Sequence, residues 1–397
     1  MGPMKGAFEV LGVFLKLGLT SFGGPIAHIG YFREEFVVRR RWISDLAFSD
    51  LVALCQFLPG PASSQLGFSI GLTRAGYWGG LAAWAGFTFP SAIALVLVAL
   101  GADVVMGPLE LGLLHGMKLV AVAIVAHAVL GMARSLCPDR QRASLAAAAA
   151  VVMLASGSTT AQIVVLLLGG AAGFWLCRSA VPASQAAMAG PVSRRIGKLS
   201  LLLFSVLLLA LPLFRGFGSW HQAALFDAFY RTGALVFGGG HVVLPLLHDA
   251  FVAPGGVTDD IFLAGYGAAQ AIPGPLFAFA AYLGAVVAPA PHRLAGALLG
   301  LTGIFLPGML ILVGTLPFWD KLRVRADAQA VMRGVNASVV GLLGAALYNP
   351  VWTSSVKSAA DVSVALAGFA LLSVWRAPPL LIVIMGAASG MMLTHNT

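Results

Sequence analysis

The residues Gln56–Pro61 read QFLPGP, and Gln270–Pro275 repeat the pattern as QAIPGP. Each motif lies inside an otherwise apolar stretch. A proline removes a backbone donor and blocks a helix, so two prolines around a glycine predict a break in the helix. Finding the same motif at two distant places predicts a fold of two related halves, each with an interrupted helix.

The two halves share more than these motifs. At shifts of 214 to 217 residues the equivalent pairs are Phe14 and Phe229, Lys16 and Arg231, Phe22-Gly23-Gly24 and Phe237-Gly238-Gly239, Glu34 and Asp249, Asp45 and Asp259, Gln56 and Gln270, and Pro90 and Pro307. Apolar stretches match each other easily by chance, but an ordered series with a cation, acids, a glutamine and two glycine motifs does not. We therefore infer an internal duplication.

Composition indicates a membrane protein. Of the 397 residues 59% are hydrophobic and 10% are charged, whereas a soluble domain averages about a quarter charged. Runs such as Trp78–Leu100 and Leu109–Met132 reach the roughly 20 apolar residues that cross a bilayer. The net charge of +9 does not indicate nucleic-acid binding, because the basic residues are spread over short loops. Such loops favour the cytoplasmic side, and the composition is typical of a bacterial inner (plasma) membrane protein.

Loop charges predict opposite orientations for the two halves. Basic loops at 134–142, 178–198 and 321–333 are expected in the cytoplasm, and loops without Lys or Arg at 103–110, 156–161 and 248–260 outside. The loop after the first FGG carries Arg33 and Arg39–Arg41, whereas the equivalent loop of the second half carries no arginine and holds Asp249, Asp259 and Asp260. Opposite charge on equivalent loops indicates an inverted-topology repeat.

We therefore expect an all-α polytopic membrane protein with an inverted-topology internal repeat and broken helices, either discontinuous or re-entrant. The expected parts are an N-terminal half at 1–178, a basic cytoplasmic linker with a topology-flipping span at 179–219, and a C-terminal half at 220–397. Nine full spans are expected near 77–101, 109–133, 143–157, 160–177, 199–217, 293–317, 334–349, 359–375 and 377–393.

The stretches 8–42, 44–74, 220–247 and 258–290 each contain a Gly or Pro break. We favour re-entrant hairpins here, because thirteen full spans would place Arg39–Arg41 outside. Both counts place the N-terminus in the cytoplasm and the C-terminus outside.

The breaks are the candidate transport site. Unpaired backbone at membrane depth is tolerated only inside protein or along a cavity, and a half-helix that starts at a break attracts anions at its N-terminus. Matching broken helices in two halves are typical of transporter sites; the alternative is a pair of packing kinks. The candidate substrate-binding residues are Lys16, Phe22, Gly23, Gly24, Gln56, Pro59, Gly60, Pro61, Arg231, Phe237, Gly238, Gly239, Gln270, Pro273, Gly274 and Pro275.

Charged residues in apolar surroundings are the second candidate feature. Lys16 and Arg231 each precede an FGG by six residues, and a charge in a membrane segment is costly enough to suggest a function. We expect both to supply positive charge to one oxyanion site; the alternative is snorkelling to opposite surfaces. The candidate proton carriers are Glu34, Asp50 and Asp249, with surface salt bridges as the alternative for the first and the last.

Enzyme and metal sites are not expected. The three cysteines lack metal-ligand spacing, and the chain has no P-loop, His-Glu-x-x-His or Cys-x-x-Cys motif. We expect no cofactor. His28 and His241 follow the two FGG breaks at non-equivalent positions, which favours packed or interfacial histidines over a proton relay.

The FGGP at 22–25, the basic stretch ending at Arg41-Trp42, the FGGG at 237–240 and the two QxxPGP motifs together resemble the chromate ion transporter (CHR) family, in its long-chain, two-domain type. The resemblance covers nearly the whole chain. It implies chromate efflux that confers resistance, by a proton-linked or potential-driven mechanism, and opposed halves. One departure is Gly240, which stands where the first half has Pro25, so unequal contributions of the two halves are expected.

The expected partners are chromate and the lipid bilayer, without nucleic acid; a monomer and a homodimer both fit the sequence. Sulfate or another tetrahedral oxyanion is the alternative substrate, because sulfate has the same shape and charge as chromate. Export is electrically downhill, since moving one charge through 100 mV is worth about 2.3 kcal/mol and a dianion gains roughly twice that.

Overall fold

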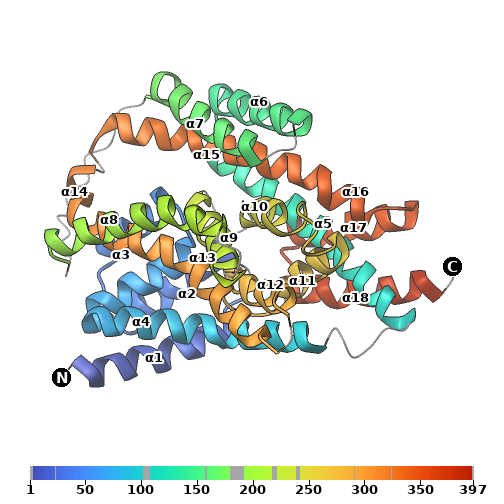
Figure 1. Cartoon of the computed structure of the whole chain (residues 1–397), viewed down its shortest axis with the longest axis horizontal. Coiled ribbons are helices and arrows are strands. Elements are labelled where there is room, and N and C mark those ends of the chain that lie inside the picture. The colour runs from blue at the N-terminus through green and yellow to red at the C-terminus, as the bar shows by residue number, and fades with distance from the viewer. Residues whose placement is uncertain are drawn as a thin grey trace. The chain divides into compact units, whose positions relative to one another are not determined.

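The computed structural model describes residues 3–22, 24–101, 108–156, 159–178, 192–216, 221–237, 242–289, 291–322 and 324–395. All regular elements among them are helical (Figure 1). The first half contains α1 (Pro3–Thr20), α2 (Gly24–Arg33), η1 (Glu34–Arg39), α3 (Asp45–Phe57), α4 (Ala62–Gly101), α5 (Pro108–Leu136), α6 (Arg140–Ser156) and α7 (Thr159–Leu176).

The rest of the chain contains α8 (Arg194–Ala210), η2 (Leu211–Gly216), α9 (His221–Leu235), α10 (Val243–Phe251), α11 (Asp259–Ala271), η4 (Leu276–Ala278), α12 (Phe279–Val287), α13 (Arg293–Thr315), η5 (Leu316–Phe318), α14 (Trp319–Leu322), α15 (Ala326–Ala346), η6 (Leu347–Trp352), α16 (Thr353–Ser355), α17 (Ala359–Ser373) and α18 (Pro379–His395).

Several helices are long and apolar enough to cross a membrane. Within the described residues these are the five stretches Ala62–Gly101, Gly112–Leu136, Arg194–Leu213, Arg293–Leu322 and Ala326–Ser355, judged by length and composition. Shorter apolar helices cover Ala161–Leu176, Leu276–Val287, Ala359–Ser373 and Pro379–Met392. Each of the nine predicted spans overlaps a helix, and the prediction of an all-helical, multi-pass membrane protein is confirmed.

The four stretches with predicted breaks are each divided. The two PGP motifs lie between α3 and α4 and between α11 and η4. The helices α3 and α11 match closely, since each has 13 residues, starts after a capping hydroxyl (Ser44 or Thr258) and ends at an extended residue (Leu58 or Ile272). In α4 the helix is interrupted again at Ala75 and Gly76, where the sequence predicted the boundary between a hairpin and a full span.

The chain forms two compact units, and each unit draws on both halves of the repeat. Unit 1 comprises Met1–Val96, Val181–Gly240 and Pro273–Arg325, and unit 2 comprises Leu97–Ala180, His241–Ile272 and Ala326–Thr397. The compact units therefore differ from the predicted parts 1–178, 179–219 and 220–397. In unit 2 the helices of one half pack mainly on helices of the other half, whereas in unit 1 α13 packs mainly on α9 and α12 of its own half.

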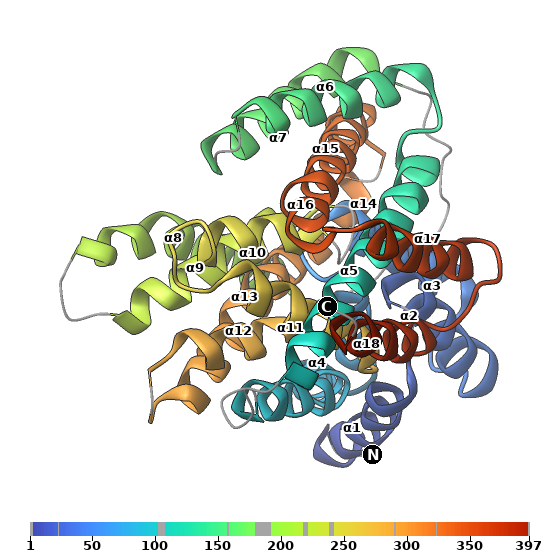
Figure 2. The same cartoon turned by 90° about the vertical axis from the view of Figure 1, so that its right-hand side faces the viewer.

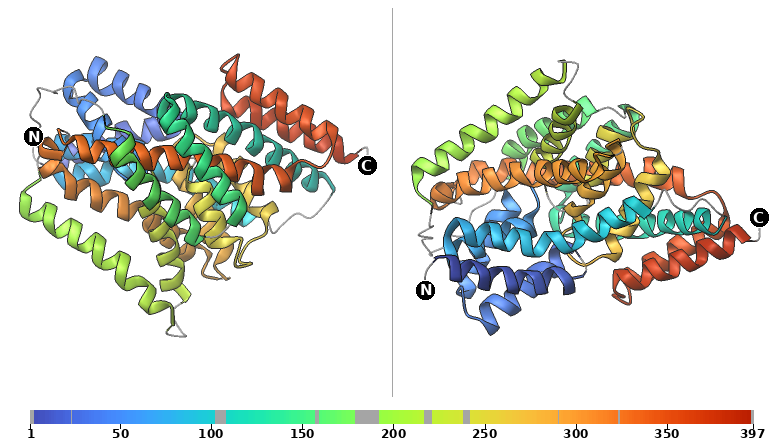
Figure 3. Two further views of the ribbon diagram at one scale, coloured as in Figure 1. Left: turned by 90° about the horizontal axis from the view of Figure 1, so that it is seen from above. Right: turned by 60° about the horizontal axis from the view of Figure 1, so that its bottom comes forward.

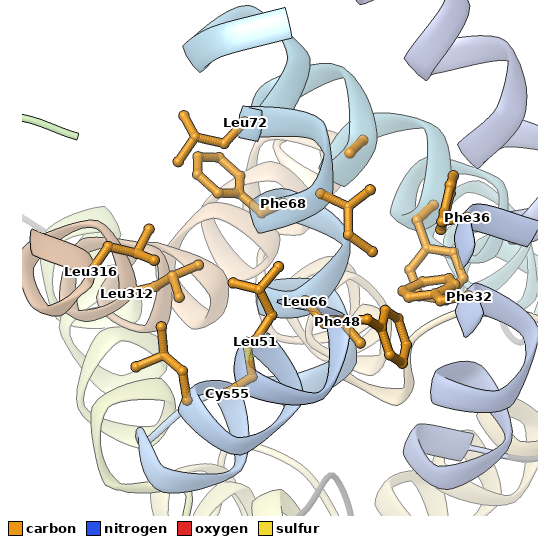
Figure 4. Packing of buried hydrophobic residues seen from close by; sticks show 14 of the residues in the cluster. Phe32, Phe36, Phe48, Leu51, Cys55, Leu66, Phe68, Leu72, Leu312 and Leu316 are labelled. Carbon is orange, nitrogen blue, oxygen red and sulfur yellow. The ribbon is translucent and has the colours of Figure 1, made fainter. Parts of the chain in front are cut away.

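Aromatic packing holds the helices around the first-half breaks in unit 1. Phe14 of α1 stacks on Phe36 at 4.9 Å between ring centroids and meets Phe32 edge-on at 5.5 Å. Figure 4 shows Phe32, Phe36 and other members of this core between their helices. Full burial of each large apolar side chain contributes about 1.5–3 kcal/mol, so the core fixes the helices on both sides of the breaks.

Glycine contacts in unit 1 recur in both halves. A β-carbon on Gly18 of α1 would lie 2.6 Å from the carbonyl oxygen of Gly86 in α4. The equivalent Gly233 of α9 meets the carbonyl of Ile304 in α13 in the same way. The close helix pair α1–α4, visible in Figure 3 as dark blue beside cyan, is thus repeated as α9–α13. The duplication inferred from the sequence extends to the packing.

In unit 2, equivalent helices exchange partners between the halves. The helix α5 packs on α17 and α18 (Figure 2), and its equivalent α15 packs on α6 and α7. Gly116 of α5 meets the carbonyl of Gly386 in α18, and Gly334 of α15 meets the carbonyl of Gly169 in α7. A long helix of each half therefore pairs with the last helix of the other half.

Candidate functional site

In unit 1, each PGP break is bonded to the break of the other half. The N–H of Gly60 donates to the carbonyl of Val236 at 2.7 Å, and the N–H of Gly274 donates to the carbonyl of Ser21 at 3.0 Å. The two donors are equivalent in the repeat, as are the two acceptors. Gly60 and Gly274 have φ values of +118° and +110°, which favour glycine. Both PGP segments are thus breaks between helices, and each is bonded to the residue that precedes the FGG of the other half. Their predicted place near the middle of the membrane stays a prediction.

Gln65 braces the first-half break. Its Nε2 donates to the carbonyls of Pro59 and Gly308, both at 2.9 Å. The side chain is fully buried, and its Oε1 has no hydrogen-bond partner among the described residues. One amide thus satisfies a carbonyl freed by the break and ties the break to α13.

A buried histidine lies at the same break. His28 is 1% exposed; its Nδ1 lies 3.3 Å from the Ser63 hydroxyl, and its Nε2 lies 3.3 Å from the carbonyl of Ser21. A carbonyl only accepts, so we assign the ring proton to Nε2 and the acceptor role to Nδ1. His28, Ser63 and Gly274 therefore all converge on the Ser21 segment.

Unpartnered polar atoms gather near these bonds. Buried side-chain atoms that lack a partner among the described residues include Ser21 Oγ at the first break and Ser64 Oγ, Gln65 Oε1, Trp84 Nε1 and Thr88 Oγ1 of α4. Leaving a buried polar group unpaired costs about 1–3 kcal/mol. Hydroxyls can donate to an oxyanion without carrying charge, and α4 starts directly after Pro61, where helix N–H groups are free.

The structure places the candidate residues from the sequence unevenly. Phe22 and Phe237 lie half-buried beside the breaks, Gly24 begins α2, and both PGP motifs form the breaks themselves. Gln56 is exposed in the last turn of α3, and Gln270 lies in the last turn of α11. Gly23, Gly238 and Gly239 lie outside the described residues, as does His241.

The two equivalent cations have different surroundings. Arg231 Nε donates to Asp227 Oδ1 at 2.8 Å, and an Nη donates to the carbonyl of Leu208 at 2.7 Å. The Asp227 side chain is fully buried, so the charge of Arg231 is compensated inside the protein. Lys16 is exposed on α1. The position equivalent to Asp227 is Gly12, which is why the repeat pattern did not reveal this ion pair.

The candidate proton carriers also differ. Glu34 is exposed, Asp50 is 8% exposed in α3, and Asp249 at the end of α10 accepts a hydrogen bond from Gln162 Nε2. In the described part of the chain, no group of three or more His, Cys, Asp or Glu side chains is arranged to hold a metal ion.

The sequence analysis missed Ser21, Ser63 and Gln65, and favoured His28 as a packed residue. Each is a single polar residue whose role depends on contacts distant in sequence. One local signal was present, since Ser63-Ser64-Gln65 follows Pro61 directly within an apolar stretch.

Comparison with known proteins adds an independent observation. A family model described as "Chromate transporter" matches residues 8–174 and again 223–391. The chain is 29% identical to the chromate transport protein of Pseudomonas aeruginosa, over 94% of this chain and 89% of that protein. It is also 29% identical to a probable chromate transport protein of Synechococcus elongatus, over 95% and 93% of the two chains. A chromate transport protein of Cupriavidus metallidurans is 26% identical, over 89% and 84%. No solved structure matches the chain.

Proposed function

The chain belongs to the chromate transporter family, and on that premise we propose that it exports chromate from the cytoplasm and thereby confers resistance. The family is one of transporters and not of enzymes. The relatives named above carry chromate in their names, which supports a tetrahedral oxyanion as the substrate.

The observation that carries this proposal is the crossed pair of bonds at the breaks. The bonds from Gly60 to Val236 and from Gly274 to Ser21 bring together interrupted helices of both halves, beside buried hydroxyls without partners. Chromate presents four oxygens that accept hydrogen bonds, and we propose that the Ser21 and Ser64 hydroxyls and the N–H groups at the start of α4 donate to them, while Ser63 donates to His28 Nδ1.

A dianion in a low-dielectric site needs further compensation, because a half-helix dipole supplies only about half a charge. The charge of Arg231 is already compensated by the buried Asp227. We therefore keep Lys16 as the proposed cation that attracts chromate to the site, and give Arg231 a structural role.

We propose that the two halves are inverted, with the N-terminus in the cytoplasm of a bacterium and the C-terminus outside its inner membrane. The opposite loop charges support this orientation. The crossed bonds at the breaks and the exchange of partners by α5 and α15 support a two-fold relation between the halves. An inverted pair fits both counts of spans, and we favour re-entrant stretches because these keep Arg39–Arg41 inside.

Outward transport is favoured on electrical grounds, since a dianion that leaves a negative cytoplasm gains about 4–5 kcal/mol at 100 mV. Sulfate is the alternative substrate, because hydroxyl and amide donors recognise shape and charge and both anions share these.

Counterflow in proteoliposomes tests the proposal. Vesicles loaded with chromate or with sulfate, at equal pH and zero potential, are given labelled chromate. Chromate-loaded vesicles should accumulate label, and a potential positive on the far side should accelerate transfer. Ser21→Ala should slow exchange about fivefold or more, whereas Ser205→Ala, an exposed hydroxyl bonded to its own helix, should not. If vesicles that contain the protein but neither anion took up as much label as chromate-loaded vesicles, chromate exchange would be refuted. Preferential exchange in sulfate-loaded vesicles would favour sulfate as the substrate.

A further inference from the structure

An imidazole–carboxylate pair closes the hairpin formed by α10 and α11 in unit 2. His248 Nε2 lies 2.7 Å from Asp259 Oδ1, and His248 Nδ1 lies 3.8 Å from Asp249 Oδ1. His248 is near the end of α10 and Asp259 begins α11. The other end of α10 follows the second FGG, and the other end of α11 precedes the second PGP. The pair therefore ties together the two helices that lead to the second-half breaks.

The first half has the same tie with a different cation. Arg33 Nε lies 2.8 Å from Asp45 Oδ1 and joins α2 to α3. Arg33 and His248 are equivalent at a shift of 215, and Asp45 and Asp259 at a shift of 214. A guanidinium stays charged at all physiological pH values, whereas an imidazole gains and loses its proton near neutrality. Only the second-half tie can therefore respond to pH.

A polar pocket of about 180 Å³ lies beside His248, lined among others by Gln162, Asp249, Leu342 and Asn349. Gln162 is 2% exposed, and its Nε2 donates to Asp249. Because the carboxylate can only accept, this bond fixes the orientation of the amide. Gln162 Oε1 then has no partner among the described residues. The pocket has room for several water molecules and offers them acceptors that are not satisfied by the protein.

We propose that this pocket is a proton-binding site: a hydronium gives its proton to the His248 imidazole, leaving water, and the charged ring tightens the α10–α11 tie. Loss of the proton to water weakens the tie and frees the two helices that lead to the second-half breaks. The coupling of this site to transport rests on the proposed function; the binding of the proton does not.

The groups around His248 support a charged ring. On its own helix the facing group is Asp249, and α11 contributes Asp259. The neighbouring Asp260 is taken by Lys118 of α5 at 2.6 Å, while Gln162 and Asn349 from α7 and η6 do not titrate. His248 lies in the last turn of α10, next to the loop that leads to α11. Burial lowers its pKa, but the hydrogen bonds with Asp249 and Asp259 outweigh burial, so the pKa is raised.

The sign of the pH response follows from this raised pKa. An ordinary imidazole titrates near 6.5. The stabilisation from the charged tie is therefore complete below about 6.5 and is lost as pH rises through the raised value.

Melting temperature in detergent, measured from pH 6 to 9 without substrate, tests proton binding alone. The wild type should lose stability as pH rises. His248→Arg, which copies the first half, should flatten this dependence, and His248→Gln should lower stability mainly at acid pH. Arg33→His should add a second pH-dependent loss, whereas Arg33→Lys, its matched control, should not. If both His248 variants kept the wild-type pH dependence of the melting temperature, the proposal would be overturned. If His248→Arg folded poorly, the same result in His248→Gln would decide the test.

Chromate counterflow at equal pH on both sides tests the coupling. The rate in wild type should change about fivefold across the titration of His248, a typical coupling between linked sites, and should change less than about twofold in His248→Arg. His115→Gln, which breaks a histidine–Asp361 pair elsewhere in unit 2, should keep the wild-type profile. A flattened melting profile with an unchanged transport profile would overturn coupling; absence of counterflow in wild type would instead refute the proposed function.

Discussion

The two PGP breaks have the same backbone arrangement, but the side chains that follow them in the sequence differ in polarity. In the first half Pro61 is followed by Ala62 and then Ser63-Ser64-Gln65, whereas the equivalent residues of the second half are Phe277-Ala278-Phe279. Gln65 bonds two carbonyls, and its equivalent Phe279 is a fully buried apolar side chain. The break and its crossed hydrogen bond are thus common to both halves, while the polar side chains directly after the break occur in the first half. The sequence departure at Gly240 led us to expect unequal halves, and the side chains after the breaks differ in the same direction.

The largest difference between equivalent positions should come from the two cations. Arg231→Ala leaves the buried Asp227 without its arginine, which should cost about 3–5 kcal/mol and remove most folded protein. Lys16→Ala should keep the folded yield and lower transport, and Lys16→Arg should be milder. Size-exclusion yield and counterflow measure the two effects separately. If Lys16→Ala transported chromate normally, Lys16 would have no role in transport, and its side chain would be assigned to snorkelling toward the membrane surface.

The two break glycines should differ next. Alanine at either position is strained by the positive φ, at about 1–3 kcal/mol. A β-carbon on Gly60 would also lie 2.9 Å from the backbone Cα of Gly308, whereas on Gly274 it would lie 2.8 Å from the Ser91 hydroxyl, a side chain. Gly60→Ala should therefore lower the melting temperature more than Gly274→Ala. Equal shifts in a thermal scan would contradict this reading.

Loss of the Gln65 side-chain hydrogen bonds should impair transport more than a change at Phe279, the equivalent apolar residue of the second half. Gln65→Leu leaves the carbonyl of Pro59 without this donor, at about 1–3 kcal/mol when buried, and removes the tie to Gly308, whose carbonyl lies inside α13. We expect transport to fall about tenfold or more. Phe279→Leu, a change of shape without lost hydrogen bonds, should cost under about 1.5 kcal/mol and leave counterflow within about twofold. If Phe279→Leu impaired transport as much, the two halves would contribute equally.

The smallest expected effect is that of a single hydroxyl after the break. Ser64→Ala removes one proposed donor, worth about 1 kcal/mol, and should raise the half-saturating chromate concentration about fivefold. Ala278→Ser, the equivalent position, should leave it unchanged. Uptake measured over a series of chromate concentrations distinguishes these outcomes. A half-saturating concentration that is not raised in Ser64→Ala would exclude the serine from the binding site.

Features of the fold that depend on local patterns were predicted well from the sequence. The repeat, the positions of the helices and both PGP breaks follow from proline chemistry and apolar run length, which act within a few residues. Even the boundary near Ala75 and Gly76 was predicted, because it separated a broken stretch from an apolar run.

Features that depend on partners distant in space were not predicted. Asp227 neutralises Arg231 at a position where the first half has glycine, so the comparison of halves concealed it. Gln65 reaches Gly308 across 243 residues, and no spacing rule connects them. The composition of the two compact units depends on such distant contacts too, since α5 and α18 approach closely at Gly116 and Gly386.

The crossed bonds between the breaks have a consequence for assembly. Each half alone would hold one glycine N–H and one carbonyl, at Gly60 and Ser21 or at Gly274 and Val236, whose partner belongs to the other half. A single half therefore carries both a donor and an acceptor that a second copy, turned over, could satisfy. The two halves expressed as separate polypeptides should accordingly associate with each other through these bonds.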